Sequence, residues 1–462
     1  MPTVEHWTDI VRRCVAGHRW IVAQDVLVSA AGVAKRLQDL GASSVLAIGA
    51  TRGTGPVPAG VATICMDVRA TSMMDGIRRG EAALDALPAE HVAAVDAFDP
   101  DGSARVVRTI FSEGRPVAGR PTWGARTPAQ VALEDKTVIG ALWDACAVPQ
   151  APHENVALDA AAVRAAFARL DEGSGVVLAG DNRSGWHGGA AYTRHARTVD
   201  EAVAIAADYA SACDVARVMP FVEGVPCSIH GIVFDDHVAA LRPCEMVVLR
   251  RDDGTFHYAG VATCWDPSPA DRAAMRAMVR RVGAHLRSTV DYRGVFTIDG
   301  VLGADGFRPT ELNPRFGAAM GGYMRPLEGL PLYLLHLAIA ARVDADWQAE
   351  ALEALLVEAA DGARYGRVFA MVDAPPDEPL RHGLRATDDG FALVDPDGPR
   401  DALFVYGPAA FGGYTAAVFD DAAVPRGASF APLAVDTLAW MDATFDLGIG
   451  PRTAARDVRA GA

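Results

Sequence analysis

Lysine is almost missing from this 462-residue sequence: Lys35 and Lys136 are the only two, although lysine and arginine together number 43. Such a bias is typical of a GC-rich genome, which encodes arginine wherever either base is acceptable. A lysine that persists against the bias indicates a site that needs a compact ammonium rather than a planar guanidinium. The bias therefore draws attention to Lys136, which lies at the start of a predicted helix.

The sequence also lacks cysteine pairs, long apolar runs and an excess of positive charge. Its seven cysteines are scattered and form no CxxC pair, which argues against a zinc site and favours reduced thiols. No basic-then-apolar leader and no run of about 18 apolar residues is present, so we expect a cytoplasmic protein without a membrane segment. The net charge of −15 argues against nucleic acid or an anionic membrane as a partner.

The length predicts several domains, because single cores stop growing at about 250–300 residues. Near the N-terminus, buried-strand patterns at Arg19–Val28 and Ser44–Gly49 flank a helical pattern at Ala30–Leu40. This order predicts a small α/β domain. Its loop Gly49–Pro56 is glycine-rich but is not GxGxxG, so we expect it to line a ligand cleft rather than to bind a dinucleotide.

The most informative stretch reads as a β-hairpin. Two strand-like segments, Gly294–Val301 and Phe307–Leu312, flank a tight turn at Ala304–Gly306. With those three residues as the loop, Asp299 lies directly opposite Glu311. Residues opposed in this way on one face of an antiparallel pair are about 5 Å apart.

Three oxygen donors then converge on one face of the hairpin. Asn313 points the same way as Glu311, because side chains alternate along a strand. Asp299, Glu311 and Asn313 are therefore predicted ligands for Mg²⁺, which keeps some waters and takes phosphate oxygens as further ligands. Arg315 follows as a permanent cation able to bind an anion through two donors. The alternative is an ordinary hairpin with a solvated acidic face.

The run Glu311–Arg315 (ELNPR), with Asp299 in GVFTID before it, resembles the metal-binding strand pair of the ATP-grasp superfamily. The resemblance implies an ATP-grasp fold of mixed α/β and α+β class. The domains expected are a pre-ATP-grasp α/β domain (1–132), a lid (133–216), a metal-binding subdomain (217–348) and a small C-terminal α+β appendage (349–462). In length and order the chain looks most like actinobacterial ATP-grasp ligases of peptide-type natural-product pathways.

The resemblance also assigns contacts to the nucleotide phosphates. A lysine at the position of Lys136 reaches the phosphates in this family, and a glycine-rich lid loop closes over them with backbone N–H groups. The loop Gly180–Gly189 fits, with Gly188 and Gly189 as its binding glycines. The alternatives are a solvated lysine in the first turn of a helix and a plain hairpin turn.

The sequence departs from the family at a second phosphate-binding lysine, which many members carry on the strand before the lid loop. Leu178 and Ala179 stand there instead. The missing charge would then come from Arg183, His187 or Arg194, and Arg183, in the loop itself, is assigned to the nucleotide.

Adenine binds in this family between the two halves of the core. The segment Val218–Glu223 fits that hinge, so Met219, Phe221, Val222 and Glu223 are the expected nucleotide-binding residues. Backbone groups near Phe221 and Val222 would bind the adenine edge. Glu223 would replace the usual acid for the amino group or ribose, the alternative being a turn-exposed carboxylate.

Three further residues are assigned to substrate binding. Arg242 and Glu245 lie near the place where the family binds phosphate and metal, and structural roles are the alternative. Arg325, beyond the hairpin, is expected to hold a substrate carboxylate.

The resemblance implies a two-step reaction that uses ATP and Mg²⁺. A substrate carboxylate attacks the γ-phosphate to give an acyl phosphate, and an amine then displaces phosphate to form an amide. Lys136 and Arg315 are the expected catalytic residues, because they place positive charge where negative charge develops. Amino acids or small peptides are the expected substrates, and dimers are common among relatives. The alternatives are a carboxylase-like enzyme that phosphorylates bicarbonate and a non-catalytic nucleotide-binding protein.

Overall fold

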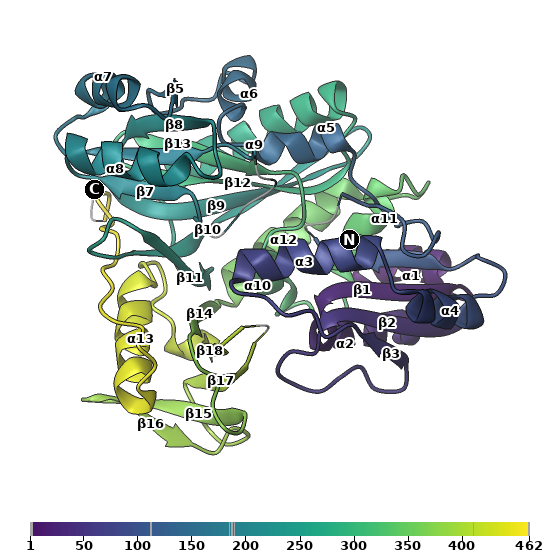
Figure 1. Ribbon diagram of the computed structural model, residues 1–462. Helices are drawn as coiled ribbons and strands as arrows, with labels where there is room; N and C mark the ends of the chain where they lie inside the picture. The colour runs from purple at the N-terminus through teal and green to yellow at the C-terminus, as the bar shows by residue number, and fades with distance from the viewer. Residues whose placement is uncertain are drawn as a thin grey trace.

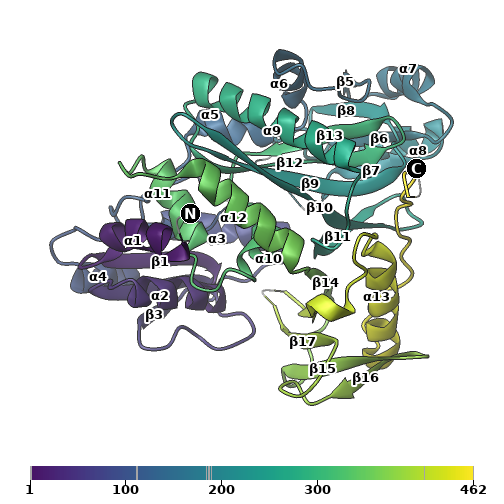
Figure 2. The ribbon, with the colours of Figure 1, turned by 180° about the vertical axis from the view of Figure 1, so that it is seen from behind.

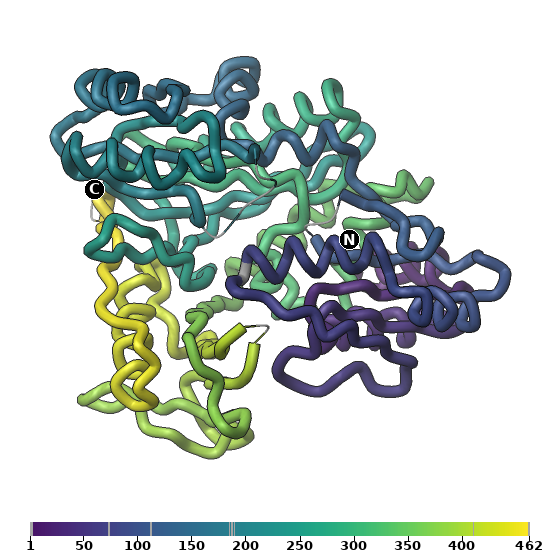
Figure 3. The backbone as a smooth tube through the Cα atoms, in the orientation of Figure 1, coloured from purple at the N-terminus to yellow at the C-terminus, as the bar shows by residue number. Residues whose placement is uncertain are grey.

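The computed structural model describes residues 3–110, 113–183, 185, 188, 190–409 and 411–460. Within these residues the chain forms two four-stranded sheets and one ten-stranded sheet. Figure 1 shows the N-terminal domain at the right, the lid at the upper left and the C-terminal domain at the bottom. The ten-stranded sheet runs between them, and the tube in Figure 3 follows the same path.

The N-terminal domain has the predicted strand–helix–strand order. Its sheet is parallel with the order β3-β2-β1-β4. Near-continuous apolar runs, as in β1 and β2, are what parallel strands buried on both faces require. The elements are α1 (Val4–Val15), β1 (Arg19–Val26), η1 (Leu27–Ser29), α2 (Ala30–Asp39), β2 (Ser44–Thr51), β3 (Ala62–Cys65), α3 (Met73–Asp85), α4 (Ala89–Phe98) and β4 (Arg105–Arg108).

The lid is an antiparallel sheet with the order β5-β8-β6-β7. Helices α7 and α8 bury their apolar residues against one face of it. The last strand runs from 215 to 220, so the expected boundary after residue 216 falls inside a strand. The elements are α5 (Pro128–Val131), η2 (Ala132–Glu134), α6 (Ile139–Ala145), β5 (Glu154–Ala157), α7 (Ala160–Leu170), β6 (Val176–Gly180), β7 (Thr193–Ala196), α8 (Val199–Tyr209) and β8 (Val215–Pro220).

The ten-stranded sheet has the order β13-β12-β9-β10-β11-β14-β18-β17-β15-β16. Helix α9 packs on β9 and β10 through an apolar stripe that contains Met275, Met278 and Val282. The elements of this half are β9 (Gly224–Val233), β10 (Val238–Arg250), β11 (Phe256–Ala262), α9 (Pro269–Thr289), β12 (Gly294–Gly303), β13 (Gly306–Asn313), α10 (Met320–Met324), α11 (Leu332–Ala340) and α12 (Ala349–Gly362).

The C-terminal strands do not form a separate sheet. Strand β14 pairs antiparallel with β11, so the sheet of the metal-binding subdomain continues into them, with α13 on one face. Helix α12 packs in the core of the preceding subdomain, and Figure 2 shows it there; the expected division at 349 is therefore not a break in packing. The elements are β14 (Gly366–Val372), β15 (Leu380–Thr387), β16 (Gly390–Val394), β17 (Ala402–Pro408), β18 (Gly413–Phe419), η3 (Asp421–Ala423) and α13 (Ala431–Phe445).

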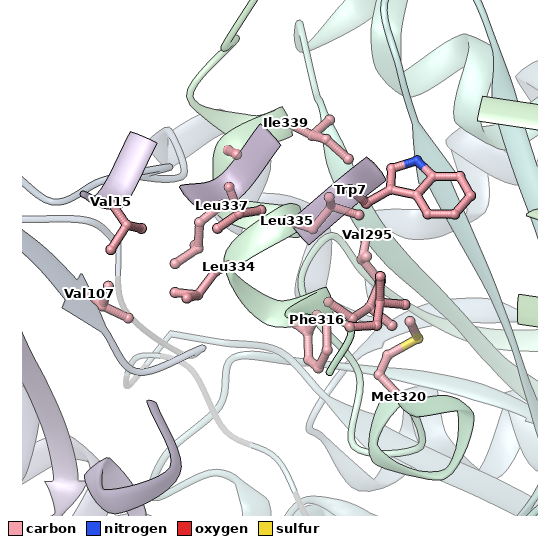
Figure 4. Close-up of a cluster of buried hydrophobic side chains, with 14 of the residues drawn as sticks. Trp7, Val15, Val107, Val295, Phe316, Met320, Leu334, Leu335, Leu337 and Ile339 are labelled. Atoms are coloured by element: carbon pink, nitrogen blue, oxygen red, sulfur yellow. The ribbon is translucent and has the colours of Figure 1, made fainter. Parts of the chain in front are cut away.

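One apolar cluster joins the N-terminal domain to the subdomain that carries the predicted metal-binding hairpin (Figure 4). Trp7 on α1 and Leu334 on α11 belong to it, together with Val295 on β12 and Phe316 just after the hairpin. Burying such side chains stabilises the contact by roughly 1.5–3 kcal/mol each. The cluster thus fixes the N-terminal domain beside the predicted metal-binding hairpin.

Two expectations drawn from what the sequence lacks can be compared with the structure. None of the helices in the described part of the chain has the length and apolar character needed to cross a membrane. The cysteines are free thiols, five of them buried and two, Cys14 and Cys65, intermediate in exposure.

Candidate active site

The predicted pairing of Asp299 with Glu311 is confirmed, although the turn differs from the expected one. Gly303 pairs with Gly306, so the turn has two residues rather than three. The register then shifts by one residue, because Thr310 is an extra residue between the pairs Gly300–Pro309 and Asp299–Glu311. Bulges of this kind re-aim side chains and are common next to active sites.

Asp299 is held by two hydrogen-bond donors. The hydroxyl of Ser228 on β9 donates to its Oδ1 at 2.5 Å, and Nδ2 of Asn313 donates to its Oδ2 at 2.8 Å. Burial, followed by the neighbouring Glu311 carboxylate, raises the pKa of Asp299 to about 6. Two carboxylates that repel each other at close range favour a cation between them.

Two cations contact polar side chains of the hairpin. Nζ of Lys136 lies 3.2 Å from Oε2 of Glu311, and Nη2 of Arg315 donates to Oδ1 of Asn313 at 2.7 Å. Lys136 does not open a helix, because it lies between η2 and α6, in the loop that connects the N-terminal domain to the lid. The predicted convergence of Lys136 and Arg315 on the hairpin is thus present.

Sequence reasoning missed Glu134, the carboxylate that holds Arg315 in place. Its side chain is 1% exposed and lies between the guanidinium groups of Arg126 and Arg315. Burial raises its pKa, but the charges of Arg315 and Arg126 more than offset this and hold the pKa below its usual value. In the sequence, Glu134 is only a charged residue two positions before Lys136, and nothing there indicates that it is buried.

The side chains on the hairpin fit a magnesium ion that takes its other ligands from water and phosphate. Among the described residues no group of three His, Cys, Asp or Glu side chains is placed to hold a metal. The candidate set is therefore two carboxylates, Asp299 and Glu311, and the amide of Asn313. Such a set suits an ion that takes the rest of its oxygens from water and phosphate. The amide of Asn313 would have to rotate to offer its oxygen, which now accepts from Arg315.

At the predicted hinge, Phe221 is already surrounded by protein groups. Its ring stacks on His195 with centroids 4.0 Å apart, and the guanidinium of Arg250 lies 4.8 Å from its centroid. Its backbone N–H donates to the carbonyl of Gly175 at 2.9 Å. Met219 is buried on β8 opposite Val177. The Phe221 N–H is therefore not open to bind adenine in this arrangement.

Glu223 does not offer a free carboxylate. Arg250 donates to both of its oxygens, at 2.8 and 2.6 Å, and the backbone N–H of Arg456 donates to it at 3.1 Å. Burial raises its pKa, but the hydrogen bonds from Arg250 more than offset this and lower it. Glu223 connects the hinge to the C-terminal residues, and its predicted contact with the nucleotide would need Arg250 to move away. Val222 lies just before Glu223 and two residues after Pro220, the last residue of β8.

The lid loop reaches the N-terminal domain. The backbone N–H of Gly188 lies 3.4 Å from Sδ of Met74 on α3, whereas Gly189 and His187 lie outside the described residues. Arg183 pairs with Asp214 at 2.6 Å and donates to the carbonyl of Ala210. A contact of Arg183 with the nucleotide would need this exposed ion pair with Asp214 to open.

Arg217 is a residue that the sequence did not single out. It lies on β8 directly opposite Ala179, on the lid face turned away from α7 and α8. Its side chain is buried, Nη2 donates to Oε1 of Gln150 at 3.1 Å, and Nε and Nη1 have no hydrogen-bond partner. Burial lowers its pKa to about 10. Among the described residues no carboxylate forms an ion pair with it.

Arg242 and Glu245 have structural roles, which corrects their assignment to substrate. Arg242 is 1% exposed, pairs with Asp266 and donates to three backbone carbonyls. Glu245 accepts from the backbone N–H groups of Phe430 and Ala431 at the start of α13. Side chains alternate along β10, and Cys244 lies on the same face of the sheet as Ser228 and Asp299. Glu245, the next residue, therefore lies on the opposite face, away from the predicted metal ligands.

Arg325 already has a carboxylate partner. Its Nη2 lies 2.9 Å from Asp420, and its guanidinium lies 5.5 Å from the centroid of the Tyr365 ring. The residue therefore connects α10 to the end of β18. Its predicted contact with a substrate carboxylate would need Asp420 to give way.

No family model matches the sequence, and no curated protein matches it significantly. Solved structures do match. The biotin carboxylase domain dimer of Hydrogenobacter thermophilus 2-oxoglutarate carboxylase, with MgADP, ADP and bicarbonate, has a TM-score of 0.57 at 12% identity over 91% of this chain and 88% of that one. Campylobacter jejuni biotin carboxylase gives 0.56 at 11% identity, covering 94% and 92%. Bacillus licheniformis L-amino acid ligase gives 0.53 at 13% identity, covering 92% and 98%. At these identities the likeness is one of fold alone.

Proposed function

We propose that this chain, which has the ATP-grasp fold, is an ATP-dependent carboxylate–amine ligase. A substrate carboxylate would attack the γ-phosphate of ATP, giving ADP and an acyl phosphate. An amine would then attack the acyl carbon, giving an amide and inorganic phosphate. The observation that carries the proposal is the opposed pair Asp299 and Glu311, with Lys136 and Arg315 over it.

Each residue of this group has a distinct task in the proposed reaction. Asp299 and Glu311, with Asn313, would hold Mg²⁺, which neutralises phosphate charge when bound. Lys136 and Arg315 hold fixed positive charge beside the carboxylates, where the phosphoryl group and later the oxyanion would lie. Preorganised donors of this kind are worth roughly 3–4 kcal/mol each. Glu134 keeps Arg315 oriented through its buried ion pair.

Arg217 is the cation that we assign in place of the missing lysine. It lies directly opposite Ala179, which with Leu178 occupies the place where many family members carry that lysine. A buried guanidinium with two unused donors and no carboxylate is costly, unless an anion completes it. The polyphosphate is the anion that the proposed reaction brings into the lid.

The Arg217 assignment predicts a selective effect on nucleotide affinity. Replacing Arg217 by Met should raise the KM for ATP at least about tenfold, because a desolvated charge pair is worth roughly 2–5 kcal/mol. Initial-rate kinetics at varied Mg-ATP measure this, and Arg164→Met, at an exposed ion pair of the same lid, serves as the control. Equal KM values for the two variants would remove Arg217 from the nucleotide site.

The proposed reaction is tested by ADP release. The protein is mixed with Mg-ATP and with pools of amino acids, dipeptides and simple acids, and phosphate and product mass are followed together. ADP that appears only with an acid–amine pair, with a product lighter than their sum by one water, supports the ligase. ADP release with bicarbonate alone would support the carboxylase-like alternative. ATP binding without turnover in every pool would count against an enzyme.

A further inference from the structure

A row of residues links the metal carboxylates to the C-terminal domain across one face of the ten-stranded sheet. Successive cross-strand partners share a face, and so do residues two apart along a strand. The row runs over β13, β12, β9, β10, β11 and β14 through Glu311, Asp299, Ser228, Cys244, Met246, Val261 and Arg367. Arg367 therefore projects from the same face of the sheet as Asp299.

This face of β14 is left partly open. Val368, Ala370 and Val372 point to the other face and are buried in the core under α13. Arg367, Phe369 and Met371 alternate with them and remain half-exposed. A strand with one packed and one accessible face offers the accessible side chains to a ligand.

Arg367 has aromatic neighbours but no acid. Its guanidinium lies 5.3 Å from the centroid of Phe369 and 5.9 Å from that of Tyr414, whose hydroxyl accepts its hydrogen bond. Among the described residues no carboxylate forms an ion pair with it. Arg325 in the same region differs, because Asp420 neutralises it. A half-buried guanidinium among rings is ready to bind an external anion.

Tyr258 lies between this cation and the metal site. Its ring packs edge-on against Phe369 with centroids 5.7 Å apart. Burial and the Asp299 carboxylate raise the pKa of its phenol, while the charges of Arg367 and Arg315 oppose that effect. From β12 to β14 is four strand spacings, or about 19 Å.

We propose that Arg367 binds the non-reacting carboxylate of the amine substrate, which is then an amino acid or a short peptide with a free C-terminal carboxylate. The proposal rests on the ligase reaction proposed above. The guanidinium fork matches a planar carboxylate through two parallel hydrogen bonds. Tyr258, Phe369 and Tyr414 form apolar walls that strengthen such a pair by excluding water. The C-terminal domain thus supplies a substrate contact.

Ligand-induced thermal stabilisation tests the carboxylate site without turnover. Two pools are compared with Mg-ADP present: the twenty common L-amino acids as free acids, and the same amino acids as primary amides. The proteins are wild type, Arg367→Met, Arg367→Lys and the control Arg381→Met, which removes an exposed ion pair on β15. The acid pool should raise the Tm of wild type and control more than the amide pool, and Arg367→Met should lose this difference. Arg367→Lys should retain part of it.

Kinetics separate this proposal from the ligase proposal. Where product forms, Arg367→Met should raise the KM for the free-acid amine substrate at least about tenfold with little change in kcat or in the KM for ATP, since the lost contact is equal in the ground and transition states. An unchanged KM, or equal stabilisation by the two pools in wild type, overturns the Arg367 assignment and leaves the ligase standing. Acid-specific stabilisation lost only in Arg367→Met, with no product from any pool, rejects the ligase and keeps the carboxylate site.

Discussion

Glu311 is the residue on which the proposed chemistry depends most directly. Glu311→Ala removes one of two opposed carboxylates and leaves Lys136 without its partner. We expect a loss of ATP turnover of at least about 100-fold, as for removal of one preorganised electrostatic group. The fold should survive, because the same change also removes the repulsion between Glu311 and Asp299. ADP-release rates and circular dichroism measure the two effects. Asp305→Ala, at the exposed tip of the same hairpin, should leave both unchanged, and unfolding of Glu311→Ala would make Glu311 structural.

Residues of the hairpin could be predicted from the sequence because strand alternation fixes which side chains share a face. Once the register is set, Asp299, Glu311 and Asn313 meet for that reason. Arg183, Glu223, Arg242 and Glu245 each have an internal partner that is distant in sequence, such as Arg250 for Glu223, and no local pattern indicates these partners. Arg217 was missed for the opposite reason, since its lack of a partner is visible only in three dimensions.

At the scale of elements, β10 carries an acid that holds helix α13 in place. Glu245 is fully buried and accepts from Ser429 and from the N–H groups of Phe430 and Ala431, where a helix leaves donors unpaired. Glu245→Ala should cost about 1–3 kcal/mol of unfolding free energy, because buried donors lose their acceptor. Urea unfolding of wild type and variant measures this, with Asp397→Ala on an exposed loop as the control. A loss no greater than that of the control would contradict the capping role.

The pairing in the hairpin was predicted correctly, but for an incomplete reason. The sequence predicts a three-residue loop, whereas the chain uses a two-residue turn followed by an extra residue at Thr310. A three-residue loop, and a two-residue turn followed by an extra residue, both place Asp299 opposite Glu311. Each adds one residue between Gly303 and Glu311. Hydrophobic pattern predicts a strand, but it does not determine where an extra residue is inserted.

At the scale of the whole molecule, the order of domains could be predicted from the sequence but their junctions could not. Alternating strand and helix patterns indicate the N-terminal domain and the lid. The joining of β14 to β11 depends on pairing between strands about 100 residues apart, which no local pattern encodes. That junction places Arg367 on the metal face and changes an appendage into a part of the proposed site.

A hydrogen bond connects the N-terminal domain to the C-terminal domain. The hydroxyl of Thr54, in the glycine-rich loop after β2, donates to the carbonyl of Pro408 at the end of β17. A Cβ added at Gly407 would collide with the Thr54 side chain, whereas one at Gly398 meets nothing closer than 3.5 Å. Gly407→Val should therefore push the N-terminal loop away from β17 and β18.

We expect this displacement to weaken substrate binding while nucleotide binding persists, because Tyr414 on β18 is a wall of the proposed carboxylate site and the nucleotide residues lie elsewhere. The KM for the amine substrate should rise several-fold in Gly407→Val, with the Kd of Mg-ADP within about twofold of wild type. Titration calorimetry and initial rates measure the two quantities, and Gly398→Ala is the matched control. A fall in Mg-ADP affinity as large as the change in KM would show that the contact supports the whole fold rather than the substrate side of the site.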